Sequence, residues 1–119
     1  MLEADRRVAY VLVIRYLTLE ARFAAALDDL SRRARAHPAL PAPPVLVALV
    51  ADLMEQTFRV VSRERFGRHL KRLRPDSALT LAELLLRLEE AEAALGAFKA
   101  LYYRDDGFDE PEWLTFGEP

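Results

Sequence analysis

Proline divides this chain into three stretches that can each form one uninterrupted helix. Four prolines lie within residues 38–44, and Pro75 stands alone further along. Because proline lacks a backbone N–H and fixes φ, a helix stops where it reaches such a stretch. The same fixed φ suits the first turn of a helix, so Pro44 favours the start of the second one. We therefore predict helices over about 3–36, 45–74 and 81–104, followed by a tail at 105–119.

Within each stretch, apolar residues recur at intervals of three, four or seven positions, the period of one helix face. These residues are Val8, Leu12, Leu19, Phe23, Leu27 and Leu30, then Leu46, Leu49, Val50, Leu53, Val60 and Val61, and last Leu84, Leu88, Ala91, Leu95, Phe98 and Tyr102. The run Val8 to Ile14 also fits a buried strand. It has no Gly or Pro boundary and leads directly into Ala-rich sequence, so we interpret it as helix.

Local signals refine these boundaries. Gly67 weakens the second helix, so 45–74 forms one helix or two. Thr80 and Glu83 have the spacing of a capping box, with Leu79 and Leu84 placed as a hydrophobic staple, and Gly107 is expected to end the third helix. The sequence thus predicts one all-α domain over 1–119. We expect a bundle of three long antiparallel helices, or four if the second divides, with an irregular or hairpin-forming tail.

Composition excludes several classes of protein. Hydrophobic residues make up 52% and charged residues 30% of the chain, which predicts a folded rather than a disordered protein. The longest apolar run, Val8 to Ile14, is far shorter than the roughly 20 residues that cross a bilayer, so we expect a cytoplasmic protein without membrane contact. The absence of cysteine excludes disulfides and thiolate sites. Asparagine is also absent and 15 of the 17 basic residues are Arg, which suggests a GC-rich or thermophilic bacterium.

The two parts of the chain carry opposite charge. Residues 1–75 contain 14 basic and 8 acidic groups (net +6), and residues 76–119 contain 3 and 11 (net −8). Basic charge concentrates in one segment, which is a candidate contact for nucleic acid or an acidic partner: Arg59, Arg63, Arg65, Arg68, Lys71, Arg72 and Arg74. A solvated face that contacts the acidic C-terminal part is the alternative, and homotypic association is a third. Six acid-first pairs at i, i+4 favour the solvated face: Glu3/Arg7, Asp28/Arg32, Asp29/Arg33, Glu55/Arg59, Glu64/Arg68 and Glu83/Arg87.

Residue patterns for catalysis are sparse. The four glycines are isolated, so there is no phosphate-binding loop, and no His–carboxylate spacing indicates a metal site. Ser31, Ser62 and Ser77 lack the sequence context of a nucleophile. We expect no catalytic or metal-ligating residues, no cofactor and no small-molecule substrate. One exception is that Arg63 with His69, or Arg32 with His37, resembles the Arg–His motif of helical HEPN ribonucleases, in which His acts on RNA phosphate as acid or base.

Apolar residues of the third helix and aromatic residues of the tail are candidate interface positions: Leu84, Leu88, Leu95, Phe98, Leu101, Tyr102, Phe108, Trp113 and Phe116. Packing inside the chain explains the same pattern, with the tail folded back over the bundle. Our leading hypothesis is a non-catalytic protein-interaction or scaffold subunit that binds another protein or a second copy of itself. The alternatives are a nucleic-acid-binding helical protein and a HEPN-like ribonuclease or toxin component.

From about Arg59 onward the chain resembles the C-terminal winged-helix region of bacterial kleisins, the ScpA subunits of the SMC condensin complex. The resemblance rests on Leu70-Lys-Arg-Leu73, Leu79-Thr-Leu-Ala-Glu-Leu84, Phe98-Lys-Ala-Leu101 and Phe116-Gly-Glu118. In that family these segments form a helix, a second helix, a third helix and a short wing. The family's N-terminal motif is absent from this chain. The resemblance implies a role in chromosome segregation or condensation, with the last third of the chain packed on an SMC head.

Overall fold

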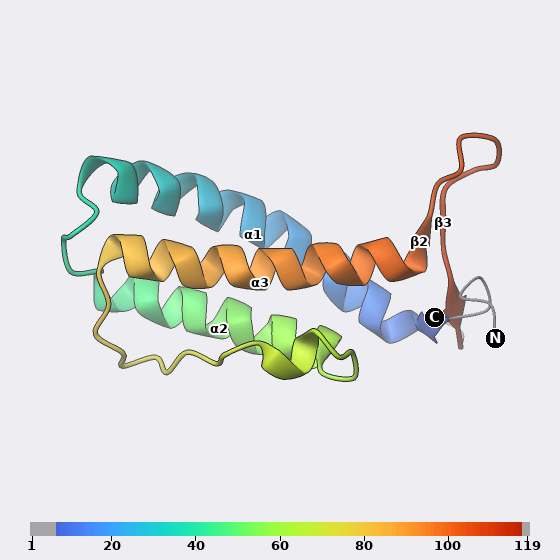
Figure 1. Cartoon of the computed structure of the whole chain (residues 1–119), viewed down its shortest axis with the longest axis horizontal. Helices are drawn as coiled ribbons and strands as arrows, with labels where there is room; N and C mark the ends of the chain where they lie inside the picture. Colours follow the sequence, from blue (N-terminus) through green and yellow to red (C-terminus); the bar gives the residue numbers. More distant parts are fainter. Residues whose placement is uncertain (1–6, 118–119) are drawn as a thin grey trace.

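The computed structural model describes residues 7–117, and most of them are helical. Three α-helices pack against one another in every pairing (Figure 1): α1 (Tyr10–Ala36), α2 (Pro44–Val61) and α3 (Leu81–Tyr102). The smaller elements are a 3₁₀ turn, η2 (Gly67–His69), and four two-residue strands, β1 (Val8–Ala9), β2 (Tyr103–Arg104), β3 (Glu112–Trp113) and β4 (Thr115–Phe116). The predicted helical fold class is confirmed in this broad sense. The parallel pairing of β1 with β4 is an addition to it.

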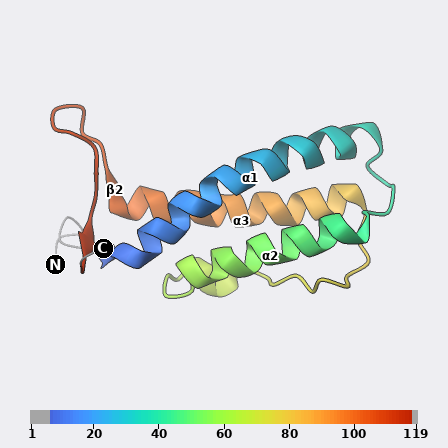
Figure 2. The same ribbon diagram turned by 180° about the vertical axis from the view of Figure 1, so that it is seen from behind.

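The predicted antiparallel arrangement is wrong for one pair of helices. α1 runs opposite to α2 and α3, but α2 and α3 run in the same direction (Figures 1 and 2). Their first turns lie together, because Pro41 forms a β-bridge with Thr80. Their last turns also lie together, because Glu64, just past α2, accepts a hydrogen bond from the Tyr102 hydroxyl at the end of α3. The connector at 62–80 joins the end of α2 to the start of α3 and runs back along the length of α2 (Figure 1).

The second predicted helix, 45–74, ends early, at Val61. After it the chain turns sharply, with backbone hydrogen bonds from Glu64 N–H to the Val61 carbonyl (2.9 Å) and from Gly67 N–H to the Glu64 carbonyl (3.1 Å). A Cβ atom on Gly67 would lie 1.8 Å from the Val61 carbonyl oxygen, so only glycine fits where the chain folds back over the helix end. Residues 70–74 have no helical structure. Neither one long helix nor two describes this region.

The predicted apolar faces of the three helices form one core. Leu19, Phe23 and Leu30 of α1 are buried, as are all six positions of the α3 pattern. Leu49 of α2 is an exception and stays 38% exposed. The buried hydroxyl of Thr57 donates to the Leu53 carbonyl at 2.7 Å, which removes the penalty of an unsatisfied polar group.

The start of α3 is capped as predicted. The Thr80 hydroxyl accepts a hydrogen bond from Glu83 N–H (3.1 Å), and Thr80 N–H donates to the Glu83 carboxylate (3.0 Å). These bonds hold the pKa of Glu83 below its usual value. The helix ends at Tyr102, two residues before the predicted end at 104. Gly107 does not end it. With φ of 81°, Gly107 lies in the loop of the hairpin that follows.

The tail folds back on the bundle. β2 and β3 form an antiparallel hairpin, and β4 pairs in parallel with β1, which ties both ends of the described chain together. First-helix residues 8 and 9 are therefore in strand rather than helix, and the predicted start at residue 3 lies outside the described residues. Trp113 packs on Tyr16, Phe98 and Tyr103, with ring centroids 5.1, 6.1 and 5.2 Å apart. The hairpin form of the predicted tail is the correct one.

Candidate functional site

The two histidines of the candidate ribonuclease motifs lie apart. His37 caps the end of α1, and His69 lies in η2. Arg63 and His69 line different clefts. Arg32 shares a groove with His37, but its guanidinium pairs with Asp28 at 3.3 Å. Within residues 7–117 no group of three His, Cys, Asp or Glu side chains is arranged to hold a metal ion.

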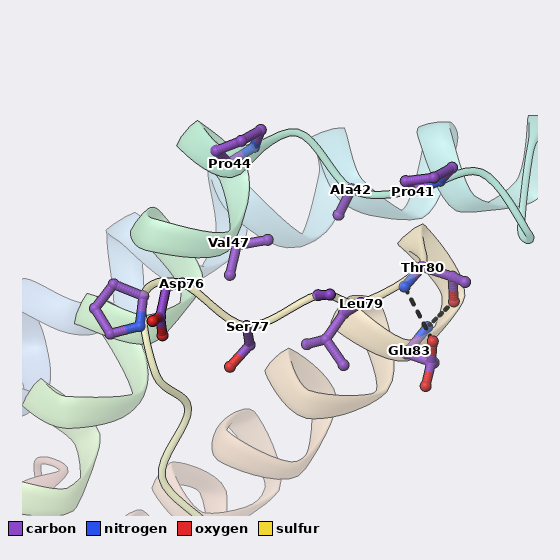
Figure 3. Close-up of a pocket in the computed structure, with 11 residues that line it drawn as sticks. Pro41, Ala42, Pro44, Val47, Asp76, Ser77, Leu79, Thr80 and Glu83 are labelled. Carbon is purple, nitrogen blue, oxygen red and sulfur yellow. Dashed lines mark hydrogen bonds between the residues drawn. The ribbon is translucent and has the colours of Figure 1, made fainter.

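A cleft of about 610 Å³ lies where the proline-rich connector meets the segment before α3 (Figure 3). Its walls are mainly apolar and include Pro41, Pro44, Val47 and Leu79. At its edge, the polar groups of Thr80 and Glu83 bind each other in the helix cap (Figure 3). The cleft can accept an apolar group. Its carboxylate, that of Glu83, is already hydrogen-bonded in the cap of α3.

One face of α1 exposes apolar side chains to solvent. Val11, Ile14 and Leu17 are 53%, 43% and 46% exposed. At 3.6 residues per turn they lie on the opposite side of the helix from the buried residues Val13, Tyr16 and Leu19. The same face continues through three small exposed residues. We call this surface the outer stripe: Val11, Ile14, Leu17, Ala21, Ala24 and Ala25.

The outer stripe was not among the predicted site residues, although the sequence contained a signal for it. Seven consecutive apolar residues, Val8 to Ile14, cannot all face one side of a helix. Helical period places Val8 and Leu12 on the face that was predicted to be buried, so Val11 and Ile14 must point elsewhere. In the structure they point outward.

Most of the predicted interface residues fill the core instead. Five of them are buried in this chain: Leu84, Leu88, Leu95, Phe98 and Tyr102. Leu101 and Trp113 are partly buried against the same core. Phe108 and Phe116, at 94% and 55% exposed, are the two that remain open to a partner. The regular seam of α3 is therefore explained by packing within the chain.

All seven cations of the predicted basic segment are exposed. The one acid of residues 59–74, Glu64, turns inward to Tyr102, so its predicted pair with Arg68 does not form. Glu55 lies 3.2 Å from Arg72 and 4.0 Å from Arg59. In the part of the chain that the structure describes, no ion pair involves the other five: Arg63, Arg65, Arg68, Lys71 and Arg74. The predicted contact with the acidic C-terminal part is thus not formed through ion pairs among the described residues.

The other predicted i, i+4 pairs have mixed outcomes. Asp28/Arg32 and Asp29/Arg33 form, with distances of 3.3 and 3.1 Å. Glu83 is used in the helix cap, and Arg87 pairs with Glu90 at 3.7 Å instead. The remaining pair, Glu3/Arg7, includes a residue outside the described range.

A cleft of about 270 Å³ lies between the start of α1 and the end of α2. Arg15, Arg59, Arg63 and Ser62 line it together with the apolar residues Ala9, Val11 and Leu12. We call it the arginine cleft. Arg15 and Ser62 were missed because the two helices that meet here are far apart in sequence, so no local pattern could place Arg15 beside Arg63.

The loop of the hairpin carries an exposed aromatic ring among carboxylates. Phe108 lies between Asp105, Asp106, Asp109 and Glu110, and we call residues 105–110 the acidic tip. The Asp106 carboxylate accepts hydrogen bonds from the backbone N–H groups of Phe108 and Asp109, both at 3.0 Å. These bonds lower the pKa of Asp106 and give the loop a defined shape.

Comparison with protein-family models, with curated proteins and with solved structures found no match to this chain. The segments behind the kleisin resemblance differ from one another in secondary structure. Leu70 to Leu73 is not helical, and the segments at 79–84 and 98–101 lie at the two ends of α3. A hairpin follows α3. Among residues 7–117, no helix is both long and apolar enough to cross a membrane.

Proposed function

We propose that this chain is a non-catalytic protein-interaction subunit that binds a partner protein along the outer stripe of α1. The observation that carries the proposal is the exposure of Val11, Ile14 and Leu17 on the side of α1 that faces away from the core. Single exposed apolar residues are common on soluble proteins, but three in line on one helix face indicate a binding surface.

Burial of this face supplies binding free energy. Full burial of one Val, Leu or Ile side chain stabilises by about 1.5–3 kcal/mol. Because these three side chains are about half exposed, a partner that covers them gains roughly 1 kcal/mol from each. The alanines that follow have no bulk to hold a neighbour away. A partner helix can therefore lie along the stripe at close distance.

The partner is another protein or a second copy of this chain. The kleisin resemblance implies a narrower form of the same proposal, in which the chain is a cytoplasmic subunit of a chromosome-condensation complex. That form names an SMC head as the first partner to test.

The test is co-purification of a tagged chain from the lysate of its native cell. In the double variant Ile14→Asp, Leu17→Asp, two charges are placed on the stripe without any change in the core. We expect the parent chain to recover a stoichiometric protein partner or a second copy, and the double variant to lose it. Leu86→Asp is the matched control, because Leu86 is an exposed leucine on α3, away from the stripe. The proposal fails if the double variant keeps the partner or if the parent chain recovers none.

Nucleic-acid binding is a second candidate, supported by the five cations of segment 59–74 that lack an acidic partner among the described residues. Lys and Arg contacts to phosphate release counterions, so log K falls with log salt by about 0.9 per contact. We expect a mobility shift with duplex or single-stranded oligonucleotides at low salt that a Lys71→Ala, Arg74→Ala variant weakens. Absence of a shift at low salt eliminates this candidate. The ribonuclease alternative is tested in the same samples, because RNA cleavage that survives His37→Ala, His69→Ala eliminates it.

A further inference from the structure

We infer that two copies of this chain bind each other by placing the acidic tip of one copy in the arginine cleft of the other. The arginine cleft shares Val11 with the outer stripe, but neither Ile14 nor Leu17 lines it, so substitutions at these two residues test the proposed function separately from this inference.

The two surfaces have opposite charge. The acidic tip carries four carboxylates, and the arginine cleft is lined by three guanidinium groups. Arg15 and Arg63 form no ion pair within residues 7–117, and Arg59 is only at the 4.0 Å limit from Glu55. A guanidinium donates two parallel hydrogen bonds to a carboxylate, so arginine suits recognition of such a tip. Three like charges gathered in one cleft favour a ligand of the opposite sign.

The two surfaces also match in their apolar parts. Phe108 is 94% exposed, so the fold gains nothing from its ring. The lining of the arginine cleft includes Ala9, Val11 and Leu12 beside the arginines, and its volume of about 270 Å³ is below the roughly 300–1,000 Å³ of sites for drug-sized ligands. That size suits one aromatic side chain rather than a cofactor. Aromatic anchors that fill a pocket of the partner are common near the centre of protein interfaces.

The acidic tip does not occupy the arginine cleft of its own chain, since Phe108 is exposed. The hairpin projects away from the three helices (Figures 1 and 2), and no ion pair within the described chain joins the tip to the cleft. Both features lie at the same end of the molecule, where α1 begins and α2 and α3 end. Two copies can therefore exchange their tips around one two-fold axis, which closes the assembly as a dimer.

The tip is already organised for binding. Its loop is held by the hydrogen bonds to Asp106 and by a further bond from Gly107 N–H to the Asp105 carboxylate (3.2 Å). A loop that keeps its bound shape loses little conformational entropy when it docks. Asp109 and Glu110 have no such role among the bonds of the described residues, so their carboxylates can be changed without loss of the turn.

Sedimentation velocity of the purified full chain, over a range of concentrations at low and high salt, tests this inference. We expect a monomer–dimer equilibrium that weakens as salt rises, because salt screens exposed charge pairs. Arg63→Glu, Asp109→Lys and Phe108→Ala should each raise the dimer Kd about tenfold or more. Arg35→Glu is the control, since Arg35 is exposed at the far end of α1, and should leave the Kd unchanged.

A mixture of two variants gives the sharpest result. When Arg63→Glu is mixed with Asp109→Lys, each mixed dimer has one unchanged tip–cleft contact and one with its charges exchanged. Association should therefore return in the mixture. The inference is overturned if the chain stays monomeric at low salt, or if the mixture associates no better than either variant alone.

Two further outcomes also overturn it and identify the actual occupant. A dimer that survives Arg63→Glu but is lost in Ile14→Asp, Leu17→Asp places self-association on the outer stripe, which contradicts this inference and supports the proposed function. A monomer whose binding to a labelled oligonucleotide is abolished by Arg63→Glu shows that nucleic acid occupies the cleft.

Discussion

Helices α1 and α3 have similar lengths, 27 and 22 residues, but they distribute their apolar side chains differently. On α3 the large apolar residues are mostly buried or partly buried, and Leu86 is the one that lies well exposed. On α1 a buried face and an exposed apolar face lie on opposite sides of the same helix. The folding of this chain accounts for the large apolar residues of α3 other than Leu86. It does not account for Val11, Ile14 and Leu17, which is why we assign them to binding.

The largest effect on stability should come from the inward face of α3. Phe98 is fully buried and packs on Tyr16 and Tyr102, with ring centroids 5.8 and 5.2 Å apart. Phe98→Ala should lower the free energy of unfolding by about 3–5 kcal/mol, because it removes a large buried ring and leaves a cavity. Leu86→Ala, on the outward face, should change it by no more than about 0.5 kcal/mol. Urea unfolding of both variants checks this contrast, which breaks down if the two losses are similar.

Gly67 and Gly96 differ in the space around them, so substitution by alanine should have opposite effects on stability. Gly67→Ala should lower the free energy of unfolding by about 1–3 kcal/mol, because the added Cβ meets the Val61 carbonyl and the backbone must move. A Cβ atom on Gly96, in α3, would meet no such neighbour within 4 Å. Gly96→Ala should raise the free energy of unfolding by about 0.5–1 kcal/mol, since alanine favours the helix. Thermal unfolding distinguishes the two, and a stabilising Gly67→Ala would show that the turn after α2 is built differently.

Helices α1 and α3 also differ in how their first turns are capped. α3 begins with a capping box, whereas no side-chain cap bond is present at the Ala9 start of α1. Thr80→Ala should therefore lower the free energy of unfolding by about 1 kcal/mol and speed amide exchange in the first turn of α3. Thr18→Ala is a control, because that hydroxyl is exposed and bonds within α1 to the Ile14 carbonyl. Equal losses in the two variants would contradict the assigned role of Thr80.

The smallest effect is a pH dependence at the same cap. The pKa of Glu83 is lowered by its hydrogen bonds with Thr80, so the folded protein favours the carboxylate form. Its contribution to stability is fully present above the unfolded-state pKa and is lost as pH falls through the lowered, folded-state pKa. Glu83→Gln should remove this part of the acid dependence. Urea midpoints measured between neutral and acidic pH check it, and parallel pH profiles for the two proteins would contradict it.

Local patterns predicted the elements that depend on neighbours in sequence. The seam from Leu84 to Tyr102 follows from helical period alone, and the cap of α3 follows from two residue types at a fixed spacing. The end of α2 could not be predicted in this way. It depends on Gly67 meeting the Val61 carbonyl and on a hydrogen bond between Glu64 and Tyr102, 38 residues apart.

The candidate sites also divide into features that local sequence predicts and features that depend on contacts between distant segments. The exposure of the cations in segment 59–74 was anticipated from their charge, but the arginine cleft requires Arg15 from another helix. The predicted interface residues of α3 were chosen for being apolar, a property that core and surface positions share. For α1, helical period divides the apolar residues between two faces, and the packing of the three helices determines which face is buried.

Site-specific photocrosslinking tests the central claim most directly. A photoreactive phenylalanine analogue is placed at Leu17, on the outer stripe, and in a separate protein at Glu89, an exposed position on α3. Irradiation in the native cell should give a discrete protein adduct from position 17 and none from position 89. No adduct from position 17, or the same adducts from both positions, would contradict the assignment of the outer stripe as a protein-binding surface.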